Sequence, residues 1–108
     1  MQILRIALFV LLMGAVAPAK HAKKHGYIPD SQAALDVARA ELTHVYGKKQ
    51  IQSEEPLTAE LENGIWTVAG TLWCPDGKGG RTNHCFGGVA VIKIRQADGH
   101  ILSIAHYK

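Results

Sequence analysis

Few residues in this sequence could do chemistry, and a pair of cysteines stands out among them. Cys74 and Cys85 lie in one glycine-rich stretch, and His84 comes directly before the second cysteine. These residues allow either a disulfide or a metal site that uses all three side chains. Adjacent ligands such as His84 and Cys85 fit one tetrahedral ion poorly, and a fourth ligand would have to come from elsewhere. The disulfide is therefore favoured over the metal site. A redox-active pair is disfavoured because the Cys-x-x-Cys spacing is absent.

The other polar residues form no recognisable catalytic motif. The six histidines include no His-x-x-His or His-Glu-x-x-His ligand pair. No serine lies in a Gly-x-Ser-x-Gly elbow, and the glycines around Lys78 lack the spacing of a phosphate-binding loop. The carboxylates are scattered, so no two of them are marked as a general acid and base. We therefore expect no enzymatic activity, no cofactor and no metal.

Length and charge narrow the function further. The chain has 108 residues, of which 19% are charged, and its formal net charge is +3. This length allows a single domain. The small positive charge excludes a nucleic-acid binder that works by bulk charge, which would need a basic stripe with interleaved aromatic residues.

Residues 1–19 have the pattern of a secretory signal peptide. An apolar run from Ile6 to Ala17 is followed by Ala17-Pro18-Ala19, which places small residues at the −3 and −1 positions of a cleavage site. The run is shorter than the roughly 20 residues that a transmembrane helix needs. The sequence thus predicts an exported, periplasmic protein without a membrane anchor after cleavage. Export would place the two cysteines where disulfides persist.

The elements that must position these residues begin with one helix. Residues 20–26 form a basic linker without apolar periodicity, in which His21 and His25 are expected to be solvated. Apolar residues at three- and four-residue steps then predict a helix from Ser31 to Gly47, with Asp30 as its N-cap. A further short helical turn is expected around Gln50 and Ile51.

Strands are predicted for the rest of the chain. The pair Asn63-Gly64 predicts a type I′ hairpin turn between the first two of them. The four strands are expected at Leu57–Glu62, Ile65–Trp73, Gly87–Gln96 and His100–Tyr107, with a loop over Cys74–Phe86. This order predicts an α+β domain over residues 27–108, in which the helix packs across a curved antiparallel sheet of about four strands.

Several short segments of the sequence are similar to those of a known protein family. They are Gly26-Tyr27-Ile28-Pro29-Asp30, Val45–Ile51, Pro56–Leu72, Gly87–Ala90 and Asp98–Leu102. Through them, residues 26–108 resemble the small NTF2-fold immunity proteins of bacterial polymorphic-toxin systems. The resemblance implies a cone-shaped sheet with a helix in its mouth, no catalytic residues, and the binding of one cognate protein toxin.

The expected function is that of an exported immunity protein that neutralises an antibacterial toxin acting in the cell envelope. The loop closed by the cysteines departs from the commoner family pattern, so it is the candidate contact region. Its candidate toxin-binding residues are Trp73, Asp76, Arg81, His84 and Phe86, because aromatic and arginine side chains are enriched in binding hot spots. Trp73 and Phe86 are equally open to interpretation as core residues at strand ends. A small ligand-binding protein and a structural envelope protein remain alternatives, and the oligomeric state stays open.

Overall fold

A computed structural model describes residues 25–107 of the chain. The expected signal peptide and most of the expected linker, including His21, lie outside the described residues. The helices are α2 (Ser31–Tyr46) and α3 (Lys48–Ser53). The strands are β1 (Thr58–Glu62), β2 (Ile65–Ala69), β3 (Cys74–Pro75), β4 (Arg81–Thr82), β5 (Ala90–Arg95) and β6 (Ile101–His106). Within residues 25–107, no helix has the length and apolar character required to cross a membrane.

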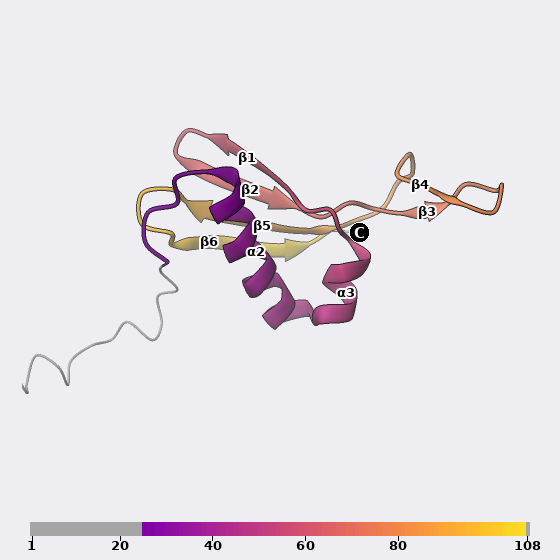
Figure 1. The fold of residues 1–108 in the computed structure, drawn as a ribbon, viewed down its shortest axis with the longest axis horizontal. Helices are drawn as coiled ribbons and strands as arrows, with labels where there is room; N and C mark the ends of the chain where they lie inside the picture. Colours follow the sequence, from indigo (N-terminus) through magenta and orange to yellow (C-terminus); the bar gives the residue numbers. More distant parts are fainter. Residues whose placement is uncertain (1–24, 108) are drawn as a thin grey trace, which may run out of the picture.

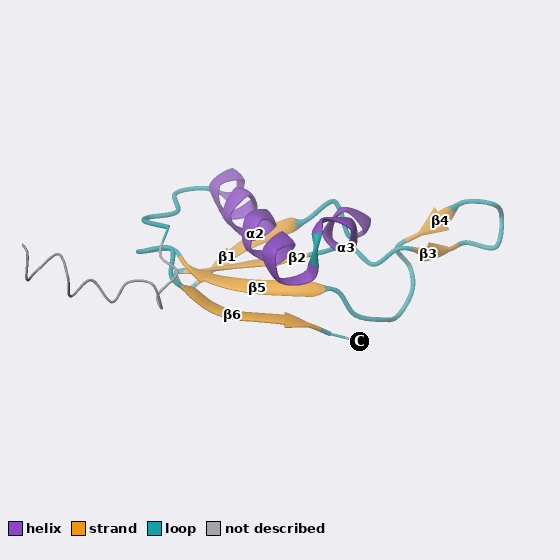
Figure 2. Ribbon diagram, turned by 90° about the horizontal axis from the view of Figure 1, so that it is seen from below, coloured by secondary structure: helices purple, strands orange, loops and turns teal. Residues whose placement is uncertain are grey.

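The α+β architecture is as the sequence predicts. Four antiparallel strands form one sheet in the order β1-β2-β5-β6, while β3 and β4 form a separate hairpin. Figure 2 shows α2 lying across one face of the four-stranded sheet. The sheet is therefore covered on one face and open on the other, which is a common arrangement for antiparallel strands.

The helix α2 forms where the sequence predicts it. The Asp30 side chain accepts a hydrogen bond from the backbone N–H of Ala33 at 2.9 Å, and Gly47 ends the helix with a φ of 94°. The helix buries Ala34, Ala38 and Leu42. Val45, in the last turn of the helix, is 50% exposed, whereas Tyr46 beside it packs against the core.

The core lies between α2 and the two central strands. Trp66 and Val68 of β2 and Ile92 and Ile94 of β5 are buried, and they alternate with residues that point to the open face. The indole N–H of Trp66 donates to the carbonyl oxygen of Ile28 at 3.0 Å, so this buried polar group is satisfied. Every second residue of both central strands therefore contributes to the core.

The N-terminal segment is attached to the domain earlier than expected. His25 and Gly26 were assigned to the linker, but His25 Nε2 lies 3.2 Å from a carboxylate oxygen of Glu41. The backbone N–H of Gly26 also donates to the carbonyl oxygen of Asp98 at 3.0 Å. The expectation that His25 is merely solvated is therefore wrong, because a carboxylate on α2 lies within its reach.

The two strands that flank the expected loop are shorter than predicted. The strand expected to reach Trp73 ends at Ala69, and the strand expected from Gly87 begins at Ala90. Between them the chain leaves the sheet and forms the β3–β4 hairpin, which projects away from the domain (Figure 1). We call residues 72–88, which contain this hairpin, the arm. The loop predicted over Cys74–Phe86 is therefore a partly regular, protruding structure.

Candidate functional site

A disulfide closes the arm. Cys74 and Cys85 are bonded to each other, with their Cα atoms 6.5 Å apart. The disulfide prediction is confirmed, and the bond leaves neither sulfur free as a thiolate ligand for the alternative metal site with His84. Within residues 25–107, no group of three or more histidine, cysteine or acidic side chains is arranged to hold a metal ion.

The tip of the arm is a tight turn organised by Asp76. Its carboxylate oxygen Oδ1 accepts hydrogen bonds from the backbone N–H groups of Lys78 at 2.7 Å and Gly80 at 3.0 Å. These bonds lower the pKa of Asp76, that from Lys78 having the largest effect. The turn also needs glycine at positions 77 and 79, where φ is 78° and 87°. Asp76, a predicted contact residue, therefore has a structural task in shaping the tip.

Two further predicted contact residues lie against each other. The guanidinium carbon of Arg81 is 4.1 Å from the centroid of the Trp73 ring, which is a cation–π arrangement. The indole N–H of Trp73 donates to the carbonyl oxygen of Glu55 at 2.9 Å, so the ring is also tied to the body of the domain. Trp73 is partly buried rather than part of the core, and Arg81 is exposed. The interaction holds the arginine head group above a fixed surface.

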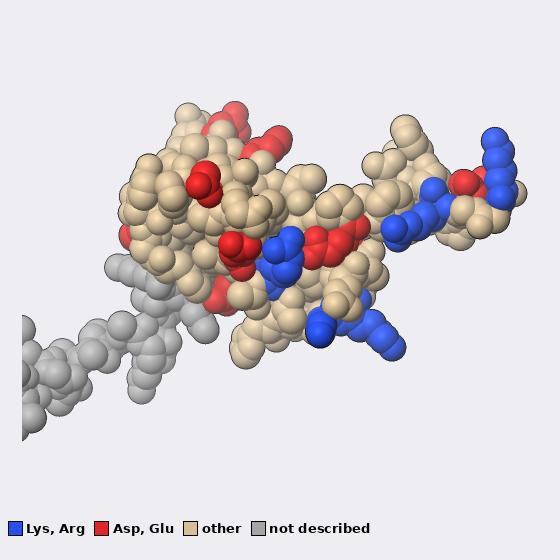
Figure 3. Space-filling view, in the orientation of Figure 1, with Lys and Arg blue, Asp and Glu red and all other residues tan. Residues whose placement is uncertain are grey.

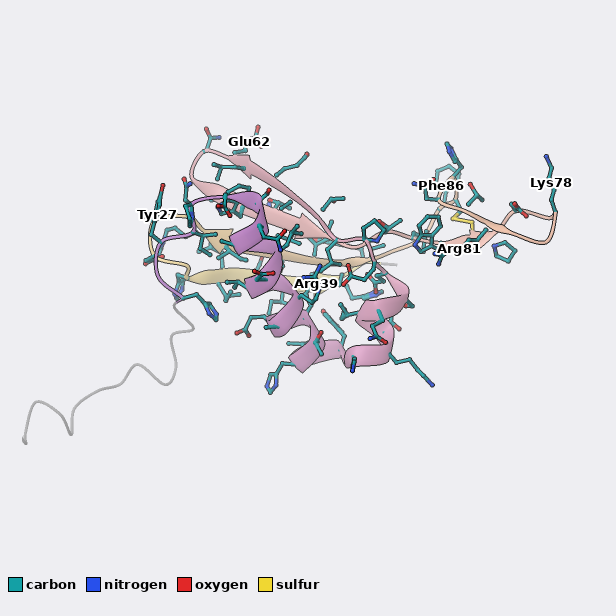
Figure 4. All side chains as sticks on the ribbon, viewed as in Figure 1. Tyr27, Arg39, Glu62, Lys78, Arg81 and Phe86 are labelled. Atoms are coloured by element: carbon teal, nitrogen blue, oxygen red, sulfur yellow. A yellow bond between two sulfur atoms is a disulfide. The ribbon has the colours of Figure 1, made fainter. Side chains whose placement is uncertain are left out.

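Phe86 is the most exposed large apolar residue among those described. Its relative exposure is 104%, against 65% for Tyr27, so the interpretation of Phe86 as a core residue is wrong. The residue follows β4, where the chain turns back toward the sheet and no other element covers it (Figure 4). His84 is also exposed, and its backbone N–H donates to the hydroxyl of Thr82 at 3.0 Å. The arm therefore brings the five predicted residues onto one protruding element.

A buried carboxylate holds the base of the arm, and sequence reasoning missed it. Glu54 is 5% exposed, and its Oε1 accepts the backbone N–H of Ala90, the first residue of β5, at 2.7 Å. Its Oε2 accepts the side-chain amide of Gln50 at 2.7 Å and lies 2.9 Å from Nε2 of His106. The Glu54 carbonyl oxygen accepts the backbone N–H of Thr71 at 2.7 Å. One residue thus contacts both chain segments that lead into and out of the arm.

The side chain of Glu54 is also closely packed against its neighbours. A Cβ atom added at Gly70 would collide with Oε1 and Cβ of Glu54. The backbone N–H of Gly70 meanwhile donates to the carbonyl oxygen of Ala90 at 3.0 Å, which closes the base of the arm. The ring of Tyr46 lies edge-on to His106, with centroids 5.4 Å apart. Glycine is therefore required at position 70 for steric reasons.

The carboxylate of Glu54 stays ionised in this setting. Burial raises its pKa, but the hydrogen bonds from Ala90, Gln50 and His106 outweigh burial and bring the pKa below its ordinary value. A neighbouring pair behaves alike: the Arg39 guanidinium donates to Glu55 at 2.7 Å and lowers the pKa of that carboxyl. Both oxygens of Glu54 are occupied by donors from the protein, so the chemistry of the Glu54–His106 pair is that of a structural anchor.

No sequence signal pairs these residues. Glu54 and His106 are 52 positions apart and belong to no motif. The glycine at position 70 lies within a run of strand-forming residues, where an isolated glycine marks a bulge or the close approach of another group. That glycine was the one indication available that the strand would be interrupted there.

The open face of the sheet carries a hollow near its edge. Its lining comes from β1 and β2, and it is made of Thr58, Glu60, Leu61, Glu62, Thr67 and Ala69. The hollow lies on the face opposite α2, away from the five predicted contact residues. The cysteine-closed arm and this hollow are thus separate surfaces.

Comparison with models of known protein families identifies a family for this chain. Neither the curated proteins nor the solved structures include a match to the chain. The sequence model of the NTF2 fold immunity proteins matches residues 33–108, a span that contains most of α2, the whole sheet and the arm. The matched span is more than half of the chain and agrees with the fold described above. This chain belongs to the family of NTF2 fold immunity proteins.

Proposed function

We propose that this protein neutralises a cognate protein toxin by binding it through the arm, without turning over a substrate. Membership of an immunity protein family supports the toxin as partner, and proteins of this family are generally not enzymes. The observation that supports the arm as the contact is Phe86, a fully exposed phenylalanine on a disulfide-closed projection. Burying such a side chain at an interface would contribute about 1.5–3 kcal/mol.

The arm is organised before any partner arrives. A disulfide closes it, two hydrogen bonds from backbone N–H groups to the Asp76 carboxylate shape its tip, and Trp73 ties it to the body. Ordering a flexible loop opposes binding, so an arm ordered in advance leaves more of the contact energy available for affinity. Arg81 and Phe86 are of the residue types that dominate binding hot spots.

We further propose that neutralisation takes place in the cell envelope. The signal-peptide pattern of residues 1–19 supports export, and the disulfide suits an oxidising compartment. An inhibitor must share a compartment with its target, so the toxin would attack an envelope component or be intercepted on its way into the cell. N-terminal sequencing of protein released by osmotic shock tests this proposal. A chain that begins at Lys20 supports it, and an intact Met1 on a protein confined to the cytosol contradicts it.

The binding proposal is tested with a candidate toxin, chosen from the proteins encoded next to the gene for this chain, directed to the periplasm and co-expressed with it. The wild-type protein should rescue growth and form a complex with the purified toxin domain. Phe86→Ala should weaken binding by about 2 kcal/mol, or roughly 30-fold, as expected for a hot-spot anchor. Arg81→Ala should cost about 1–3 kcal/mol of binding. Neither change should alter stability by more than about 0.5 kcal/mol, because both side chains are exposed.

Tyr27→Ala is the matched control. Tyr27 is an exposed aromatic residue at the opposite end of the domain from Phe86 (Figure 4). The Tyr27→Ala variant should bind the toxin as tightly as the wild type does. Equal killing with and without this protein, and no complex between the purified partners, would refute the immunity proposal. Equal losses for Tyr27→Ala and Phe86→Ala would refute the arm as the contact surface.

A further inference from the structure

We propose that the arm recognises an acidic face of its toxin, in which carboxylates surround an apolar pocket that accepts Phe86. This inference rests on the proposed function and adds the chemistry of the partner surface. The cations of the arm are Lys78 at its tip and Arg81 on β4 (Figure 4). Among residues 25–107, neither side chain forms an ion pair with a carboxylate.

The acidic residue of the arm, Asp76, leaves the arm with a net charge of +1 and forms no ion pair with Lys78 or Arg81 within residues 25–107. Asp76 directs a carboxylate oxygen to the backbone N–H groups of Lys78 and Gly80, so part of its hydrogen-bonding capacity is used inside the turn. Two more lysines, Lys48 and Lys49, are exposed on the short helix α3. The end of the molecule that carries the arm therefore presents cations that lack carboxylate partners in the described structure.

The body of the domain has the opposite character. In the view of Figure 3, acidic side chains predominate on the body, with a basic group among them, whereas basic side chains predominate on the arm, which also carries an acidic group, and at α3 below it. Glu60 and Glu62 are exposed on β1, and the half-buried Arg39 of the body is paired with Glu55. Such a distribution of charge steers an acidic partner toward the arm, which speeds association and favours one orientation.

The position of Arg81 favours a carboxylate partner in particular. Its guanidinium lies over the Trp73 ring, and no described acceptor takes a hydrogen bond from it. A guanidinium held on an aromatic surface has lost part of its rotational freedom, while its N–H groups can still bind a carboxylate in a bidentate manner. The exposed apolar side chain on the same arm, Phe86, favours a pocket over a flat charged surface.

A nucleic acid is the other anionic macromolecule that such an arm could meet. Its phosphate backbone is bound by many cations, and affinity rises with the number of phosphates that are neutralised. The arm supplies two cations, and the chain belongs to a family of immunity proteins. These observations favour a protein surface, and nucleic-acid binding becomes an outcome of the test.

The experiment measures association and dissociation rates with the purified toxin domain at low and at high salt. The test variant is Lys78→Glu combined with Arg81→Glu, and Lys78→Glu alone serves as a milder second variant. Lys93→Glu is the matched control, because Lys93 is an exposed lysine on the open face of the sheet, away from the arm. Thermal melting curves verify that each variant is folded. A labelled single-stranded oligonucleotide is titrated in parallel.

The inference predicts an association rate that falls at least about tenfold between low and high salt for the wild type. The double variant should associate at least about tenfold more slowly at low salt and lose most of this salt dependence, whereas Lys93→Glu should stay within about twofold of the wild type. Equal association of the wild type and the double variant would overturn the acidic surface while leaving toxin binding intact. Tight oligonucleotide binding that the double variant loses would also overturn it. A wild-type protein that does not bind the toxin at all would instead refute the proposed function.

Discussion

Replacing the buried carboxylate at the base of the arm should have a large effect on stability. Glu54 is 5% exposed and accepts hydrogen bonds from Ala90, Gln50 and His106. Removing one member of a buried charged network typically costs about 3–5 kcal/mol. In Glu54→Ala, the side chains of Gln50 and His106 can turn toward water, but the N–H of the buried residue Ala90 cannot. We therefore expect the lower end of that range, about 3 kcal/mol.

The assay is urea denaturation followed by tryptophan fluorescence, since Trp66 reports on the core and Trp73 on the base of the arm. Glu54→Gln should cost about 1–2 kcal/mol, because its amide oxygen can still accept the N–H of Ala90 while the charge is lost. That variant keeps the test valid if Glu54→Ala does not fold.

Glu60→Ala is the matched control for a general effect of removing a carboxylate. Glu60 is exposed on β1, and its loss should change the free energy of unfolding by less than about 0.5 kcal/mol. A cost below about 1 kcal/mol for Glu54→Ala, or equal costs for the two alanine variants, would refute the role assigned to Glu54 as an anchor.

Three further predictions concern the same region. The pKa of Glu54 in the folded protein lies below its ordinary value of 4.5, so the contribution of Glu54 to stability is complete above pH 4.5 and is lost as the pH falls through the folded pKa. Glu54→Gln should therefore lose less stability in acid than the wild type, as measured by urea denaturation across pH. Gly70→Ala should destabilise the protein by about 1–3 kcal/mol, since the added methyl group collides with the Glu54 side chain, and thermal melting measures this cost. Replacing Cys74 and Cys85 together by serine should raise hydrogen exchange in the arm while the amides of β2 and β5 stay protected, because the disulfide joins residues within the arm alone.

Local patterns predicted the domain well because its elements follow simple periods. The helix from Ser31, its Asp30 cap and the Asn63-Gly64 turn, with φ values of 52° and 76°, are set by neighbouring residues in the chain. The strand before the arm was predicted too long because β-branched and aromatic residues continue past Ala69. What ends β2 there is a tertiary contact between the following residues and Glu54.

The candidate site was predicted in part. Residue type and the expected disulfide led to the arm, and the structure places all five named residues on it. Their separate roles depend on geometry that composition does not contain: Asp76 organises a turn, Trp73 supports Arg81, and Phe86 is exposed. The anchor at Glu54 was missed because it joins residues that lie far apart in the chain. Only the folded sheet brings His106, at the end of β6, beside that carboxylate.

The anchor at Glu54 fixes the direction of the arm relative to the sheet. The β3–β4 hairpin has two residues in each strand, and an isolated two-stranded hairpin is at best marginally stable in water. The disulfide fixes the hairpin within itself but does not set its direction relative to the sheet. That direction is set where residues 70, 71 and 90 meet Glu54, because hydrogen bonds specify angles as well as distances, whereas apolar packing alone tolerates sliding. Any change in the angle between the arm and the sheet displaces the side chains at the far end of the arm. A buried, fully hydrogen-bonded carboxylate at that base therefore holds the exposed Phe86 and the Trp73-supported Arg81 in one fixed orientation relative to the sheet.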